Sequence, residues 1–137
     1  MADNDIDSIK SQALKEFNNQ FFEFMDDIAR IFPTYPEIKT SRMFVSMLST
    51  FKPACIIIFV NDYIIKPYGS HIKNGDMDFF SNNDFSKDSN VGDSTYILDK
   101  IKTVTNFITM MTVSEKETIA VYLQNMAALC EIYFSSS

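Results

Sequence analysis

Apolar side chains recur every three or four residues along the first quarter of the chain, a spacing typical of a helix with one buried stripe. The stripe ends just before Pro33, which disfavours a further helical turn. Its members are Ile6, Ile9, Ala13, Phe17, Phe21, Phe24, Ile28 and Ile31. Charged residues occupy the opposite face. The pattern therefore predicts a long N-terminal helix over residues 6–32.

Two more helices are predicted before Pro67. Residues 37–51 form the first, and its inward side chains are expected to be Ile38, Phe44, Met47, Leu48 and Phe51. Residues 54–65 form the second, with Pro53 at a position suited to a first helical turn. The β-branched run 54–60 also suits a buried strand, which stays the alternative. The thirteen residues between the two prolines favour the helix.

The segment 68–93 differs from the rest of the chain in composition, since it holds all three glycines, the single histidine and five aspartates. We expect a loop-rich acidic segment here, with a turn at Asn74-Gly75. Asp76 can cap a short helical turn over residues 77–80.

Two helices are predicted after this segment. Residues 94–111 form one, capped by Asp93 or Ser94, with Ile97, Ile101, Val104 and Ile108 expected inward. Ser114 and Glu117 match a capping box that starts the last helix. The apolar side chains of that helix are Ile119, Tyr122, Leu123, Met126, Leu129, Cys130 and Tyr133. The short connection at 112–113 predicts an antiparallel helical hairpin.

These elements predict an all-α fold, namely a compact single-domain bundle of about five helices spanning residues 1–137. The length of 137 residues suits one domain, and 46% hydrophobic with 22% charged residues is a globular composition. A chain of this size can bury a core without a metal or a disulfide.

Charge narrows the classes of partner. The net charge of −6 disfavours nucleic-acid binding, which needs clustered lysines and arginines. Residues 32–74 nevertheless carry two acids and five bases. Those bases are Lys39, Arg42, Lys52, Lys66 and Lys73. We interpret them as a solvated surface, with a patch for phosphate or an acidic partner as the alternative.

The sequence predicts no catalytic residue, cofactor or metal ion. His71 is the only histidine, and no acid lies at a sequence spacing that indicates a catalytic pair with it. Two cysteines and one histidine are too few ligands for a zinc site. The aspartates of 76–93 depart from the EF-hand pattern in the place of the glycine and lack its glutamate. Cys55 and Cys130 are expected to be reduced core thiols. The acidic N-terminus indicates a protein that is not secreted, and the longest apolar run, seven residues, predicts no membrane span.

Some aromatic and methionine side chains lie outside the regular stripes or in the loop-rich segment. They are the candidates for an exposed partner-binding patch. These candidates are Phe22, Met25, Tyr35, Phe79 and Phe80.

The stretches 17–33, 72–80 and 122–126 resemble small helical proteins of nucleocytoplasmic large DNA viruses. The resemblance implies a viral origin. The abundance of residues that AT-rich codons encode, such as Ile, Asn, Lys and Phe, is consistent with that origin. We therefore expect a non-enzymatic structural protein of the virion, associated with capsid or core through protein–protein contacts. The alternative is a host-directed module that presents a groove to a host helix. The expected partners are viral or host proteins or a second copy of the chain, in the virion or the host cytoplasm.

Overall fold

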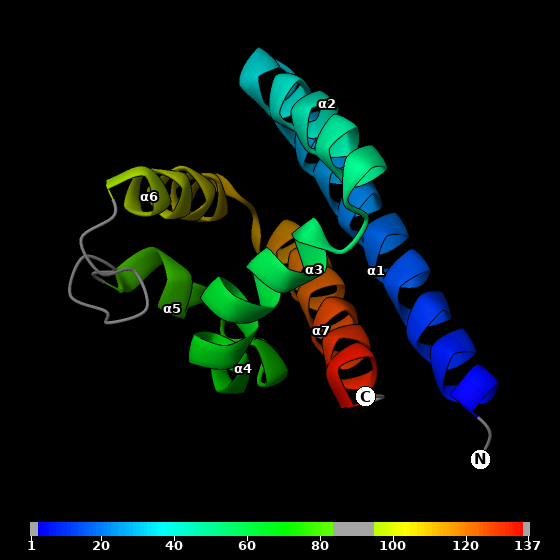
Figure 1. Ribbon diagram of the computed structural model, residues 1–137. Coiled ribbons are helices and arrows are strands. Elements are labelled where there is room, and N and C mark those ends of the chain that lie inside the picture. The colour runs from blue at the N-terminus through cyan, green and yellow to red at the C-terminus, as the bar shows by residue number, and fades with distance from the viewer. Residues whose placement is uncertain (1–2, 84–94, 136–137) are drawn as a thin grey trace. The chain divides into compact units, whose positions relative to one another are not determined.

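The computed structural model describes residues 3–83 and 95–135 (Figure 1). Every regular element in these ranges is helical, which confirms the all-α prediction and excludes a strand at 54–65. The elements are α1 (Asp3–Ile31), α2 (Pro36–Phe51), α3 (Cys55–Val60), a π-helical segment (Asn61–Ile65), α4 (Lys66–Lys73), α5 (Met77–Asn82), α6 (Thr95–Met110) and α7 (Val113–Ser135).

The chain divides into two compact units. The first unit consists of Met1–Asn61 and Asn125–Ser137, and the second is Asp62–Gln124. The buried apolar side chains of the first unit are Ala13, Phe17, Ile28, Ile38, Ile56, Ile57, Val60, Met126 and Cys130. Those of the second are Tyr68, Ile72, Met77, Phe80, Phe107, Ile108, Met111, Ile119 and Ala120.

In the first unit, α1 begins three residues before and ends one residue before the predicted helix 6–32, and α2 lies alongside it (Figure 1). Phe32 closes α1 by donating its backbone N–H to the Ile28 carbonyl at 3.0 Å. Pro36 stands in the first turn of α2, where a missing N–H is tolerated. The rigid corner at residues 33–35 thus reverses the chain so that α2 packs along α1 and α3 packs against both.

The orientation of α2 differs from the prediction. Of the five residues expected inward, Ile38 is buried as predicted, whereas Phe44, Met47, Leu48 and Phe51 are exposed. The row that faces inward consists of Ile38, Arg42, Val45 and Ser49, all buried or half-buried. The reason is an anchor on α1: the Arg42 guanidinium pairs with Asp26, with Nε 2.6 Å from Oδ1. The larger apolar stripe of α2 lies on the opposite side of the helix and faces solvent.

The helix that begins at α3 does not stop at Pro67, contrary to the sequence prediction. The chain continues through the π-helical segment into α4, where Pro67 lies in the first turn and needs no N–H partner. A kink at Tyr68, with φ −123° and ψ 17°, follows the proline. Much of the predicted loop-rich segment 68–93 is therefore helical, while residues 84–94 lie outside the described part of the chain.

The turn and cap predicted in the second unit are confirmed. Gly75 adopts a φ of +69°, a left-handed conformation that glycine accepts readily. The Asp76 carboxylate then accepts a hydrogen bond from the Phe79 backbone N–H at 3.3 Å and caps α5. Gln124 of α7 donates to the carbonyl oxygens of Ile72 and Lys73 at 3.1 and 3.3 Å, which holds the end of α4.

The boundary between α6 and α7 required correction. The N-cap of α7 is Thr112 and not Ser114: its hydroxyl accepts from the Glu115 N–H at 3.1 Å, and the Glu115 carboxylate accepts from the Thr112 N–H at 2.9 Å. A capping box is present, but two residues earlier than predicted. In α6, Ile108 is buried as expected and Val104 is exposed.

The remaining predictions for the C-terminal region concern the cap of the helix 94–111, two of its inward side chains and the helical hairpin. Asp93 and Ser94, and the side chains of Ile97 and Ile101, lie outside the described part. Within the second unit, the part of α7 up to Gln124 does not run back along α6 as an antiparallel hairpin would, and α6 packs against α5 (Figure 1).

Candidate interaction surface

The outward side of α2 is the most apolar exposed surface of the first unit. We call it the α2 face; its members are Met43, Phe44, Met47, Leu48 and Phe51. The spacing of 1, 3, 1 and 3 residues places all five on one side of the helix. Phe51 is 84% and Met43 71% exposed, so these side chains contact little of their own chain.

Basic residues flank the α2 face at both ends. Lys39 lies one turn before Met43 and is exposed, and Lys52 is the exposed C-cap residue of α2. Neither side chain forms an ion pair with a residue in the described ranges 3–83 and 95–135. From α3, which packs against α2, Ile58 and Phe59 add further exposed apolar surface.

Three of the candidate partner-binding residues belong to the first unit but lie apart from the α2 face in the sequence. Phe22 is half-buried beneath the Arg42 guanidinium, which lies 5.0 Å from its ring centre. Met25 is also half-buried. Tyr35 is exposed at the corner between α1 and α2, with its ring edge-on to Phe32 at 5.9 Å. Phe22 thus helps to anchor α2.

The other two candidates, Phe79 and Phe80, belong to the second unit. Phe80 was expected on an exposed binding surface, and this prediction is wrong, because its side chain is only 6% exposed. The ring lies in the core and packs edge-on against Tyr68 at 6.0 Å. Phe79 is half-buried and stacks on the His71 ring at 3.7 Å. His71 Nδ1 lies 3.3 Å from the Asp76 carboxylate, which links the ring to the α5 cap.

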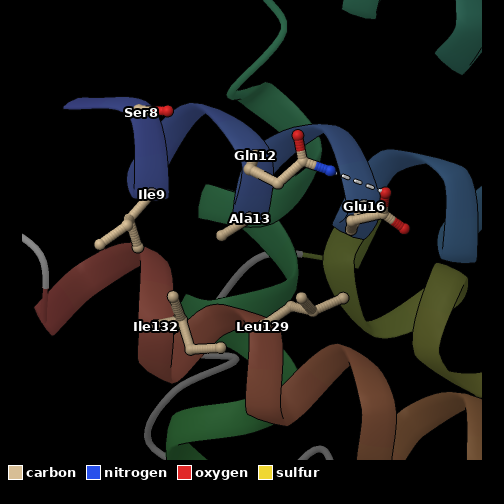
Figure 2. Close-up of a pocket in the computed structure, with 7 residues that line it drawn as sticks. All are labelled: Ser8, Ile9, Gln12, Ala13, Glu16, Leu129 and Ile132. Carbon is tan, nitrogen blue, oxygen red and sulfur yellow. Dashed lines mark hydrogen bonds between the residues drawn. The ribbon is translucent and has the colours of Figure 1, made fainter. Parts of the chain in front are cut away.

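A hollow of about 410 Å³ lies between α1 and the C-terminal half of α7 in the first unit (Figure 2). Figure 2 shows Ile9 and Ala13 pointing toward Leu129 and Ile132 across it. Its polar edge includes Glu16, whose carboxylate accepts a hydrogen bond from Gln12 at 3.0 Å. A single carboxylate on an apolar wall offers no pair of groups for acid–base chemistry.

The described side chains supply little reactive chemistry. Within residues 3–83 and 95–135 no group of three His, Cys, Asp or Glu side chains is placed to hold a metal ion. Burial raises the pKa of the Cys130 thiol from 9.0 to about 12, so this group stays protonated at neutral pH. Cys55 is half-buried and, like Cys130, forms no disulfide.

No single helix in the described ranges is long and apolar enough to cross a membrane. Taken together, Pro36–Phe51 and Cys55–Lys73 are long and apolar enough by length and composition alone, but the two helices are bent by 115° relative to each other.

Comparisons with protein-family models, curated proteins and solved structures find no match. The helical spacing grouped Phe44, Met47, Leu48 and Phe51 correctly on one side of α2, but that side was predicted to face inward. The informative signal was Arg42, which stands in the middle of the opposite row and needs an acidic partner there.

Proposed function

We propose that the protein is a non-enzymatic interaction protein whose docking surface is the α2 face. One observation carries this proposal: the helix packs on α1 through a row that contains Arg42 and turns its larger apolar side chains to solvent. Contiguous exposed apolar patches of this kind mark interaction sites.

The chemistry of the α2 face supports this proposal. Phenylalanine and methionine are enriched at the centres of protein interfaces, and methionine adapts its shape to a partner. Burial of each such side chain by a partner stabilises a complex by about 1.5–3 kcal/mol before the costs of association. Five of them on two and a half helical turns are enough for a specific contact.

A narrower proposal concerns the biological setting. The resemblance to proteins of large DNA viruses supports a role as a small virion component, capsid- or core-associated, acting in the virion or the host cytoplasm. Mass spectrometry of purified virions tests it, because a virion component is present at a fixed ratio to the capsid protein.

The alternative of a host-directed module that holds a host helix in a groove has less support. The hollow between α1 and α7 is apolar, but its 410 Å³ is small for a helix about 10 Å across. We therefore favour the α2 face over this groove.

Site-specific photocrosslinking in the native cell tests the proposal. A benzophenone side chain at position 51 should give discrete crosslinked products, because Phe51 is the most exposed member of the α2 face. The matched control is position 113, since Val113 is 73% exposed in the second unit. Equal, diffuse labelling from both positions would contradict the α2 face as the docking surface.

A further inference from the structure

After Glu37 in its first turn, α2 and the chain that follows it carry only basic charges up to Asn61. From Ile38 to Asn61 the chain contains no aspartate or glutamate, and its charged residues are Lys39, Arg42 and Lys52. Arg42 is neutralised by Asp26, which leaves the two exposed lysines at the ends of the α2 face. The whole chain carries −6, so this basic and apolar surface stands out from an acidic protein.

This combination matches the surface of an anionic lipid bilayer. Helices that lie in the membrane interface present phenylalanine, leucine and similar side chains to the acyl boundary and lysines to the phosphates. Each basic residue near an anionic leaflet adds to binding, while acidic residues elsewhere are repelled and orient the protein. The α2 face supplies the apolar side chains, and Lys39 and Lys52 supply the charges.

We propose that the α2 face binds the surface of a membrane that contains anionic lipids. The proposal rests on the function proposed above and names the partner of that surface. Phe51 and Met43 enter the interface, and Lys39 and Lys52 contact headgroup phosphates at either end of the helix. Ile58 and Phe59 of α3 add apolar surface next to the same helix.

Contact between the α2 faces of two copies of the chain fits these charges less well. The two exposed lysines would need acidic partners, and Glu37 is the only acid on α2. An anionic bilayer meets both lysines whatever the rotation of the protein about the membrane normal. The absence of acids over residues 38–61 therefore favours lipid over contact between two α2 faces.

A fluorescence titration tests the proposal without disturbing the core. The chain has no tryptophan, so Phe51→Trp introduces a single probe in the α2 face and Val113→Trp a matched probe in the second unit. Vesicles are made of phosphatidylcholine alone or of equal parts phosphatidylcholine and phosphatidylserine. We expect a blue shift for the Phe51→Trp protein on the anionic vesicles and little change for the Val113→Trp protein.

Co-sedimentation with the same vesicles separates the contribution of the apolar side chains to binding from that of the lysines. The variant Met43→Gln/Met47→Gln/Phe51→Ser should bind on the order of a hundredfold more weakly. The variant Lys39→Gln/Lys52→Gln should bind about twenty-five-fold more weakly, at about fivefold for each lysine. The matched charge control, Lys73→Gln/Lys102→Gln, should bind as the unchanged protein does.

Other outcomes overturn the proposal. Absence of a shift on anionic vesicles excludes the membrane, and photocrosslinks from position 51 to a protein would then leave the docking surface itself intact. A concentration-dependent dimer in sedimentation velocity that the triple variant abolishes would identify the α2 face as a self-association surface. Equal binding by the triple variant and the unchanged protein would show that lipid is bound elsewhere.

Discussion

Helix α2 in the first unit and helix α5 in the second carry neighbouring bulky apolar residues, yet they use them in opposite ways. In α5, Met77 and Phe80 are buried, and the exposed Asp78 carboxylate pairs with Lys116 at 3.1 Å. In α2, Arg42 pairs with Asp26 on the inner side, and Phe51 is left in solvent. In both helices the bulky apolar side chains and the paired charged side chain lie on opposite sides, and we infer that the position of the charge's partner contributes to which side is buried.

The same comparison separates stability from function. Side chains such as Phe80 contribute to folding because they leave water when the chain folds. Those of the α2 face stay in water after folding, so they add little to stability and remain available to a partner. The predictions below test this division, beginning with the largest expected effect.

Truncation of one phenylalanine in each helix tests the division directly. Phe80→Ala removes a ring that is 6% exposed and should lower the free energy of unfolding by about 3–5 kcal/mol. Phe51→Ala removes one that is 84% exposed and should change it by less than about 0.5 kcal/mol. Urea denaturation followed by circular dichroism measures both. Similar losses in the two variants would mean that the α2 face is covered in solution.

The sequence predicted the elements better than their orientation. The 3–4 spacing from Ile6 to Ile31 predicted α1, and an aspartate before a short apolar helix predicted the Asp76 cap. Both signals are local. The Arg42–Asp26 pair joins residues sixteen apart on different helices, and no sequence spacing indicates it.

The misplaced N-cap has a related cause. Thr112 with Glu115 and Ser114 with Glu117 both match the capping-box pattern, so the sequence offers two starts for one helix. The choice depends on where α6 ends and on how the second unit packs. For the candidate site, the sequence supplied the basic block that holds Lys39 and Lys52, but not the exposure of the helix between them.

The pH dependence of stability tests how dry the interior of the first unit is. Cys130 is 1% exposed, and burial raises the pKa of its thiol to about 12. The folded protein therefore keeps this proton at pH values where the unfolded chain, with a thiol pKa near 9.0, loses it. The thiol's contribution to stability is complete at pH values well below 9 and should fall by about 1 kcal/mol between pH 8 and pH 10.

Comparison with Cys130→Ala isolates this effect, because lysines and tyrosines titrate in the same range in both proteins. The variant should be less stable at pH 8 but should lack the thiol's share of the loss at pH 10. Parallel pH curves for the two proteins would show that water reaches Cys130.

One threonine variant and one serine variant test where α7 starts in the second unit. Thr112→Ala removes the hydroxyl that accepts from the Glu115 N–H and should destabilise the protein by about 1 kcal/mol. Ser114→Ala leaves that bond in place and should change stability by only a few tenths of that. Thermal melts of the two variants give the comparison. A larger loss for the serine variant would move the helix start to the later capping box.

The smallest effect concerns the pair that orients α2. In a double-mutant cycle with Arg42→Gln and Asp26→Asn, we expect a coupling energy of about 0.5–1 kcal/mol, because the ion pair is half-exposed and partly screened by solvent. The matched control is Lys66 with Asp62, a pair on neighbouring turns at 3.7 Å whose coupling should be close to zero. The Arg42→Gln protein should also lose the contact with the Phe22 ring, which makes its single-variant cost larger than the coupling. If Arg42 and Asp26 show no more coupling than the control pair, their contact does not orient α2, and the contrast with α5 needs another physical cause.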